Sequence, residues 1–153
     1  MSGSPRDPHR IAGYAGAMSV FTSAVAGAAL AARRTGKVPE RYSVLDLALG
    51  AVATHKLARI VSKEGVTTPI RAPFTEFEGE AGSAELTESP KDGAGHTVGE
   101  LLTCPFCLAP WIASGYVAAL ALAPNAARAW AATFSVVGGS DFLQHAYART
   151  RGD

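Results

Sequence analysis

Three stretches of the chain are apolar over lengths that suit a membrane-spanning helix. Residues 11–32 are 22 residues without a charge, and two further apolar runs occupy residues 101–123 and 126–147. A hydrocarbon core about 30 Å thick needs roughly 20 helical residues to cross it. The pattern therefore predicts an all-α fold with about three transmembrane helices.

The alternative is a soluble helical bundle whose Ala-rich helices form the core. Small residues dominate residues 11–32, and they insert into lipid less favourably than Leu or Ile. An amphipathic helix would place polar residues at every third or fourth position, whereas this stretch has only Ser and Thr there. Small residues four apart, such as Gly13 and Ala17, also suit close helix contacts in lipid. We therefore favour the membrane protein.

Residues 43–63 show a different, amphipathic pattern. Ser43 and Asp46 have the spacing of a capping box, so Asp46 is either a helix cap or a functional carboxylate. At 100° per residue, one side of this helix gathers the polar residues His55, Lys56, Arg59, Ser62 and Lys63. The pattern predicts an amphipathic interfacial helix whose basic face attracts anionic lipid headgroups, or binds a phosphorylated or acidic ligand. No aromatic interleaving or nucleic-acid-binding motif accompanies it, so we expect no nucleic-acid partner.

Residues 64–100 contain a proline-containing strap followed by an acidic stretch. Pro69 and Pro73 restrict the backbone around Arg71. We expect a rigid, nonhelical strap in which Arg71 binds a phosphate or carboxylate, or pairs with an acid of the following loop. Residues 76–100 hold seven acids and one Lys, which predicts a flexible, solvated loop. Its charge either folds back on the basic face or belongs to a simple linker.

Charge is distributed unevenly, although the formal net charge is only +1. Residues 1–63 hold nine Lys and Arg against three acids, whereas residues 64–100 hold two against eight. Cytoplasmic loops carry an excess of Lys and Arg, and the basic residues just after residue 32 outnumber those of the N-terminal tail, residues 1–10. We therefore expect the N-terminus outside, with the central loop and the basic tail, residues 148–153, in the cytoplasm.

Cys104 and Cys107 form a CPFC motif at the start of the second apolar run. Pro105 and Pro110 indicate that regular helix begins near residue 108, which places the cysteines on a turn at the membrane surface. Two thiols at this spacing are structural or idle, bind a metal ion such as zinc, or perform redox chemistry. Closed zinc sites take four ligands, and only His96 lies conveniently near in sequence. The sequence does not firmly imply any cofactor.

The third apolar run ends in ionisable residues. Asp141 and His145 are four apart and can share one helical face. Asp141 falls near the expected cytoplasmic interface, so it is either an interfacial anchor or a site for a proton or ion. Three helices enclose little space, and a carrier built on Asp141 would require oligomerisation.

The order of several short motifs resembles one known family. The sequence ATHKLARIVSK at residues 53–63 precedes RAPF at residues 71–74, and GEL at residues 99–101 leads into CPFC and Trp111. This succession resembles the bacterial membrane proteins grouped as domain of unknown function 1360, over roughly residues 43–147. The resemblance implies a small multi-span protein of a bacterial cell membrane and lends no catalytic residues.

The sequence favours a non-catalytic adaptor or structural membrane protein over an enzyme. One alternative is a protein that uses Cys104 and Cys107 for thiol redox chemistry or metal binding. Another is a small carrier that uses Asp141. The expected partners are the lipid bilayer, including anionic lipids, and either a second copy of the chain or another membrane protein.

Overall fold

The computed structural model describes residues 7–82 and 84–152. The chain is mostly helical, and its four long helices are α1 (Pro8–Arg34), α2 (Val44–Lys63), α5 (Pro105–Leu122) and α6 (Pro124–Arg151). The shorter elements between α2 and α5 are the 3₁₀ turn η1 (Gly65–Thr67), the helices α3 (Thr68–Arg71) and α4 (His96–Thr103), and the strands β1 (Thr75–Gly82) and β2 (Glu85–Pro90). Residues 1–6 of the expected N-terminal tail and residue 153 of the expected basic tail lie outside the described residues.

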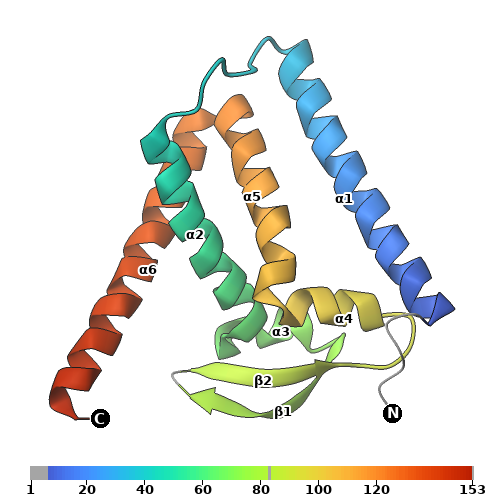
Figure 1. Ribbon diagram of the computed structural model, residues 1–153, viewed down its shortest axis with the longest axis vertical. Coiled ribbons are helices and arrows are strands. Elements are labelled where there is room, and N and C mark those ends of the chain that lie inside the picture. The colour runs from blue at the N-terminus through green and yellow to red at the C-terminus, as the bar shows by residue number, and fades with distance from the viewer. Residues whose placement is uncertain (1–6, 83, 153) are drawn as a thin grey trace.

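The four long helices extend between the same two ends of the molecule (Figure 1). The hairpin end holds α3, α4, β1 and β2, together with the start of α1 and the end of α6. The loop end holds residues 35–43, which join α1 to α2, and Ala123, which joins α5 to α6. Helices α1 and α5 run from the hairpin end to the loop end, and α2 and α6 run back.

Helix α2 is the central element of the bundle and packs against both α5 and α6. The core between these helices consists of Ala53, Tyr116, Leu120, Ala127 and Ala131. A Cβ at Gly50 would lie 2.1 Å from the ring of Tyr116, so only glycine allows this close approach of α2 to α5. Residues 43–63 thus form a helix as predicted. One of its faces carries small residues that pack against other helices, and its position at a membrane interface stays a prediction.

Helix α1 stands at the side of the bundle and leaves its apolar side chains outside. Its contacts are with α5 and α4, and they include an edge-to-face contact between Phe21 and Trp111 with ring centroids 5.1 Å apart. Met18 is 69% exposed and Val20 is 61% exposed, and Ala32 is the buried residue of this helix. In lipid, such side chains would face hydrocarbon rather than water.

Two helices in the described part of the chain, α1 and α5, are long and apolar enough to cross a membrane. Helix α6, which contains the expected third membrane helix, is not among them. It carries charged groups such as Arg128 and Asp141 between its apolar residues. Of the three expected membrane helices, length and hydropathy therefore support two, α1 and α5.

Strands β1 and β2 form an antiparallel hairpin where we expected a flexible loop. Their register runs from Thr75 opposite Pro90 to Gly82 opposite Glu85, with two irregularities. The fold is thus mostly helical rather than all-α. Sequence pattern did not indicate the hairpin because contacts with other elements hold it in place, namely with α2, which is remote in sequence, and with α4, which follows it.

The proline-containing strap is also more helical than expected. Residues 65–67 form η1 and residues 68–71 form α3. Pro69 occupies the first turn of α3, where the missing backbone N–H costs no helical hydrogen bond. The expectation of a nonhelical strap was therefore wrong for these residues.

Candidate functional site

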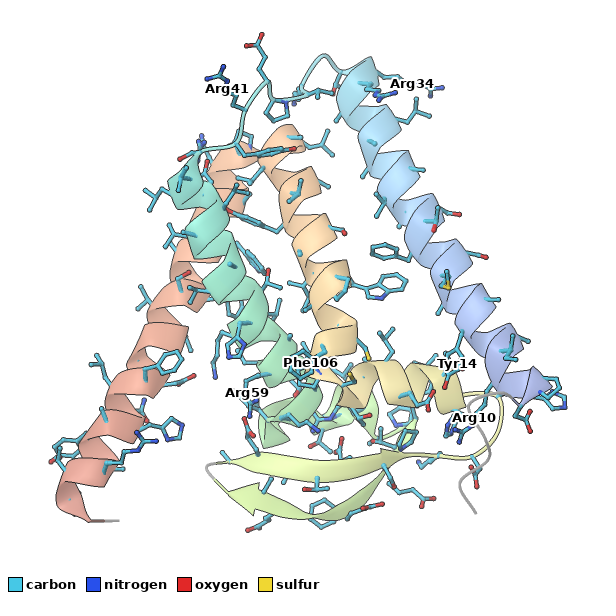
Figure 2. All side chains as sticks on the ribbon, viewed as in Figure 1. Arg10, Tyr14, Arg34, Arg41, Arg59 and Phe106 are labelled. Atoms are coloured by element: carbon cyan, nitrogen blue, oxygen red, sulfur yellow. The ribbon has the colours of Figure 1, made fainter. Side chains whose placement is uncertain are left out.

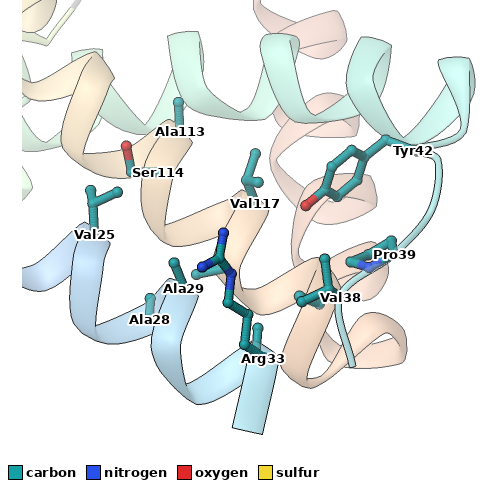
Figure 3. A pocket seen from close by; sticks show the side chains of 13 residues that line it. Val25, Ala28, Ala29, Arg33, Val38, Pro39, Tyr42, Ala113, Ser114 and Val117 are labelled. Carbon is teal, nitrogen blue, oxygen red and sulfur yellow. The ribbon is translucent and has the colours of Figure 1, made fainter. Parts of the chain in front are cut away.

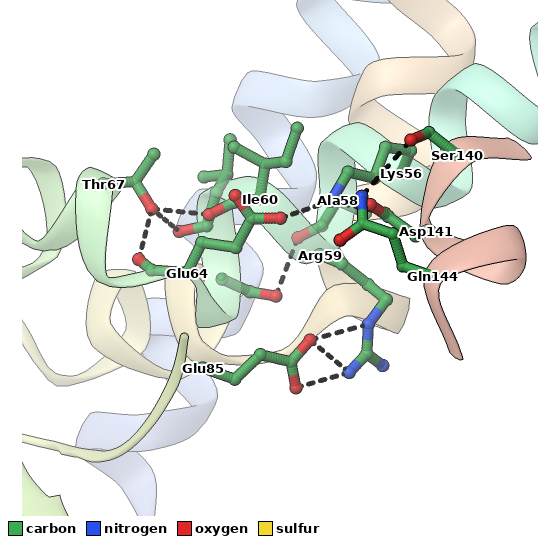
Figure 4. A network of polar contacts seen from close by, with 12 residues as sticks. Lys56, Ala58, Arg59, Ile60, Glu64, Thr67, Glu85, Ser140, Asp141 and Gln144 are labelled. Carbon is green, nitrogen blue, oxygen red and sulfur yellow. Dashed lines mark hydrogen bonds and ion pairs between the residues drawn. The ribbon is translucent and has the colours of Figure 1, made fainter. Parts of the chain in front are cut away.

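Lys56 of α2 lies between two carboxylates at the hairpin end (Figure 4). Its Nζ is 2.8 Å from Oδ2 of Asp141 in α6 and also forms an ion pair with Glu64. The Lys56 side chain is 11% exposed, so the charge is held inside the bundle. Asp141 therefore pairs with Lys56 and not with His145, which is exposed one turn further along α6.

Arg59 of α2 binds the hairpin. Its guanidinium donates to both carboxylate oxygens of Glu85 in β2, from Nη2 at 2.5 and 2.6 Å and from Nε to Oε1 at 3.1 Å. Figure 2 shows Arg59 at the junction of α2 and the sheet. Of the predicted basic face, His55 is exposed and Lys63 is half-buried, and neither has an ion pair among residues 7–82 and 84–152. Lys56 and Arg59 are thus the residues of this face that pair with acids, and Arg59 pairs with the acidic segment that folds back on it.

Arg71 is the most deeply buried charge of the hairpin end. Its side chain is 0% exposed, and its Nε donates to Oε2 of Glu88 at 2.5 Å. Its Nη1 donates to the carbonyls of Val61 at 2.8 Å and Glu64 at 3.0 Å, and to Oγ1 of Thr67 at 2.6 Å. Of the two roles proposed from sequence, pairing with an acid of the following segment is confirmed. Arg71 joins the end of α2, η1 and β2 into one unit.

Glu100 of α4 connects α1 to the hairpin end. Tyr14 Oη donates to its Oε2 at 2.7 Å, and Arg10 Nη1 lies 3.8 Å from its Oε1. His96 Nε2 is 3.3 Å from Glu100 Oε1, so the imidazole faces a carboxylate. The start of α1 and the segment before α5 therefore lie at the same end of the molecule. If α1 spans a membrane, this contact rules out the expected topology with the N-terminus outside and the central loop inside.

Cys104 and Cys107 are free thiols at the start of α5. Cys104 is the N-cap residue, and its Sγ accepts a hydrogen bond from the backbone N–H of Cys107 at 3.2 Å. Helix begins at Pro105, in the position where proline is tolerated, so Cys107 lies in the first turn and not on a preceding turn as expected. In the described part of the chain, no group of three or more His, Cys, Asp or Glu side chains is placed to hold a metal ion. His96 therefore does not complete a three-ligand site with the two cysteines.

A second ion pair joins α2 to α6 near the loop end. Arg128 donates from Nε and Nη2 to the two carboxylate oxygens of Asp46 at 3.0 and 2.9 Å. The backbone carbonyl of Asp46 accepts a hydrogen bond from Tyr116 Oη at 2.8 Å. Ser43 is the N-cap of α2, as predicted, but its side chain makes no capping hydrogen bond. Asp46 is thus an interhelical ion-pair partner rather than part of a capping box.

Sequence analysis missed two hollows at the loop end. Basic residues flank them, and they include Arg33, Lys37, Arg41 and Arg128. A signal for a basic site was present, because four Lys and Arg occur in residues 33–41 directly after an apolar helix. From the sequence, these residues were interpreted only as an indication of the orientation of the first span.

Comparison with known proteins gives one match. The family model described as "Protein of unknown function (DUF1360)" matches residues 49–147, a range that includes most of α2, the hairpin, α4, α5 and most of α6. Comparison with curated proteins and with solved structures finds no match for the chain.

Proposed function

The chain belongs to the DUF1360 family of proteins of unknown function, and from this premise we propose that it is an integral protein of a bacterial membrane in which all four long helices cross the bilayer. The observation that carries the proposal is the exposure of large apolar side chains along the outer faces of these helices. Met18 of α1 is 69% exposed, and Val136 and Leu143 of α6 are each 73% exposed. Soluble monomers rarely expose contiguous apolar surface of this extent to water, whereas the outer faces of membrane helices must be apolar because they contact lipid.

The direction of the helices supports four crossings instead of three. Helices α1 and α5 both start at the hairpin end, so the chain must return between them, and α2 is the element that does so. Its 20 residues reach about 30 Å as a helix. Two of its charges do not oppose this placement, because Asp46 pairs with Arg128, Lys56 pairs with Asp141, and the side chains of Asp46 and Lys56 are each 11% exposed. Membrane helices tolerate ionisable groups when these groups are paired and face the bundle interior.

The distribution of Lys and Arg supports a cytoplasmic hairpin end. The described segments at that end, residues 7–10, 63–82, 84–100 and 149–152, hold six Lys and Arg, and residues 33–43 at the loop end hold four. Under the positive-inside rule the hairpin, the N-terminus and the C-terminus then lie together in the cytoplasm. The central region stays cytoplasmic as expected from sequence, and the N-terminus joins it.

Within this architecture we propose a non-catalytic adaptor that docks a basic protein segment on β1. In the two-stranded sheet one edge of β1 pairs with β2, and no strand among the described residues pairs with the other edge. Along β1 the carboxylates of Glu76, Glu78 and Glu80 are exposed, and they have no ion pair among the residues that the structure describes. Phe77 beside them is 65% exposed. A free strand edge with unpaired acids and an aromatic side chain suits addition of a basic extended segment.

Site-specific photocrosslinking in native membranes tests this role. A photoreactive residue at position 77 is expected to give a discrete adduct with another protein, and the same residue at the lipid-facing position 20 of α1 is the control. The triple variant Glu76→Gln, Glu78→Gln, Glu80→Gln should remove the adduct, because it keeps the strand and removes the charge. Absence of any protein adduct from position 77 would refute the adaptor, and release of the protein from membranes by alkaline carbonate would refute the membrane placement.

A second candidate is a thiol redox protein, favoured by the exposure of Cys107 within one helical turn of Cys104. An accessible thiol beside a second one at a helix start suits thiol–disulfide exchange. Replacing both cysteines by Ser separates the candidates, because the adaptor should keep its crosslink from position 77. A carrier built on Asp141 stays a prediction, and its carboxylate is engaged by Lys56.

A further inference from the structure

The loop end carries one continuous hollow with an apolar part and a basic part. The apolar part is a groove of about 460 Å³ between α1, the connecting residues 38–42 and α5. The basic part is a pocket of about 510 Å³ between those same connecting residues, the start of α2, the end of α5 and the start of α6. The two parts share Pro39, Tyr42 and Ala121 in their walls. They are thus neighbouring sections of one site.

The walls of the groove are almost wholly aliphatic. Helix α1 contributes Val25 and several alanines, and α5 contributes Val117 with further alanines. Figure 3 shows the Arg33 side chain reaching from α1 toward Val117, and the hydroxyl of Tyr42 turned toward the same space. The Arg33 guanidinium has no hydrogen bond or ion pair within residues 7–82 and 84–152. The groove therefore offers a long apolar surface that ends beside an unneutralised guanidinium.

The adjoining pocket has an excess of positive charge. It is lined by Lys37, Arg41 and Arg128 against one carboxylate, that of Asp46. Arg128 is committed to Asp46, and Lys37 Nζ donates to the carbonyl of Leu122 at 3.2 Å. Arg41 is exposed, and no described residue pairs with it. Arg33 and Arg41 are thus cations of this hollow whose guanidinium groups remain available to an external anion, and Lys37 beside them keeps its charge because its partner is a neutral carbonyl.

We propose that this hollow binds an anionic phospholipid, with one acyl chain in the groove between α1 and α5 and the phosphate between Arg33 and Arg41. Guanidinium groups bind phosphate through charge-assisted hydrogen bonds, and a largely apolar cavity with a few convergent polar groups is the usual form of a small-molecule site. The inference rests on the proposed membrane placement, which puts the loop end at the level of the headgroups. A free phosphate would use the basic pocket alone and would leave the groove without a role.

This site replaces the headgroup-binding face that we predicted on α2. Lys56, Arg59 and Arg71 are neutralised by acids of the chain itself, and of the predicted cations Lys63 is not; at the loop end both Arg33 and Arg41 are left without an acid among the described residues. The expectation of anionic lipid as a partner is kept, and its location moves to the opposite end of the bundle.

Thermal unfolding of the purified full chain in detergent tests the proposal, with added phosphatidylglycerol, phosphatidylcholine or inorganic phosphate. We expect phosphatidylglycerol to raise the melting temperature and to remain bound through gel filtration, because ligands that bind only the native state stabilise it. The double variant Arg33→Gln, Arg41→Gln should weaken this binding about tenfold. Val117→Trp, which fills the groove and leaves the cations, should also abolish it. Arg34→Gln is the matched control, because Arg34 is the neighbouring cation and does not line the hollow.

Three results would overturn the proposal. Equal stabilisation by phosphatidylcholine would show that the phosphate charge is not recognised. Equal stabilisation by inorganic phosphate would indicate a free-anion site without use of the groove. Unchanged binding in both variants would place the lipid elsewhere. Carbonate extraction distinguishes failure of the lipid-site proposal from failure of the membrane placement. If the chain resists extraction and still gives one of these results, only the lipid-site proposal fails.

Discussion

The phenolic hydroxyl of Tyr14 donates a hydrogen bond of 2.7 Å to the carboxylate of Glu100. This bond joins the beginning of α1 to α4, the helix that leads into the CPFC motif. At the same junction, Thr97 Oγ1 would lie 2.1 Å from a Cβ on Gly13, so the glycine allows α1 to approach α4 closely. Because both α1 and α5 start from this junction, α2 must carry the chain back. In the proposed membrane placement, the Tyr14–Glu100 contact thus requires four crossings instead of three.

The ion pair of Lys56 with Asp141 predicts a graded loss of stability. Asp141→Asn should lower the free energy of unfolding by about 1–2 kcal/mol, because Lys56 keeps Glu64 and the Asp141 side chain is already 38% exposed. Lys56→Met should cost more, about 2–4 kcal/mol, since it leaves both carboxylates uncompensated. Thermal unfolding in detergent measures both. His145→Gln, on the same helix, is the control and should change little, and an equal loss from this variant would contradict the assignment.

Gly50 predicts a sharp steric effect between α2 and α5. Gly50→Ala places a methyl group where the Tyr116 ring lies 2.1 Å away, and overpacking of this kind costs about 1–3 kcal/mol. Gly139→Ala is the matched control in α6, because nothing lies within 4 Å of its Cβ position. Alanine favours helix over glycine, so the control should keep or raise the melting temperature. Equal melting temperatures for the two variants would show that α2 does not pack on α5 in this way.

Arg71 predicts that the hairpin depends on one buried guanidinium. Arg71→Lys keeps the charge but removes the fork that joins Glu88 to the carbonyls at the end of α2, and leaving buried acceptors unpaired in this way costs about 1–3 kcal/mol. Hydrogen exchange of β1 and β2 should accelerate. Arg59→Lys is the comparison, because that side chain is 40% exposed and its loss should cost about 1 kcal/mol or less. Unchanged exchange in Arg71→Lys would refute the anchoring role.

Cys104 predicts a capping effect that does not depend on redox state. Cys104→Ser keeps an acceptor for the N–H of Cys107 and should preserve stability, because serine is a preferred N-cap residue. Cys104→Ala loses the acceptor and should cost about 0.5–1 kcal/mol. Chemical denaturation under reducing conditions separates them. If Cys104→Ser proved as destabilising as Cys104→Ala, the thiol would have a role other than that of a cap.

Much of the helical structure follows from the sequence pattern. The apolar run at residues 11–32 lies within Pro8–Arg34, and the amphipathic run at residues 43–63 matches Val44–Lys63 within one residue. These helices are predictable because their signals are local: hydrophobic periodicity, an N-cap serine and prolines in first turns. The family was predictable for a similar reason, since short motifs keep their order along the chain.

The arrangement of the helices was not predictable from these local signals. The basic side chains of α2 have the periodicity of a solvated face, and their partners Glu85 and Asp141 lie 26 and 85 residues away from Arg59 and Lys56 in sequence. The hairpin was missed for the same reason, because Glu and Gly are poor strand formers and ion pairs from α2 and α3 hold the strands. The loop-end hollow required the fold, since it combines residues of α1, α2, α5 and α6.

The most direct test of the account is the accessibility of four single cysteines in a Cys104→Ser, Cys107→Ser background. The positions are His9, Glu78 and Arg149 at the hairpin end and Glu40 at the loop end. A membrane-impermeant maleimide applied to intact cells should label Glu40→Cys, and the other three should be labelled only after permeabilisation. The reversed pattern would invert the orientation and keep the four crossings. Labelling of Glu40→Cys and Glu78→Cys from the same side would contradict the account, because α2 would then not cross the membrane.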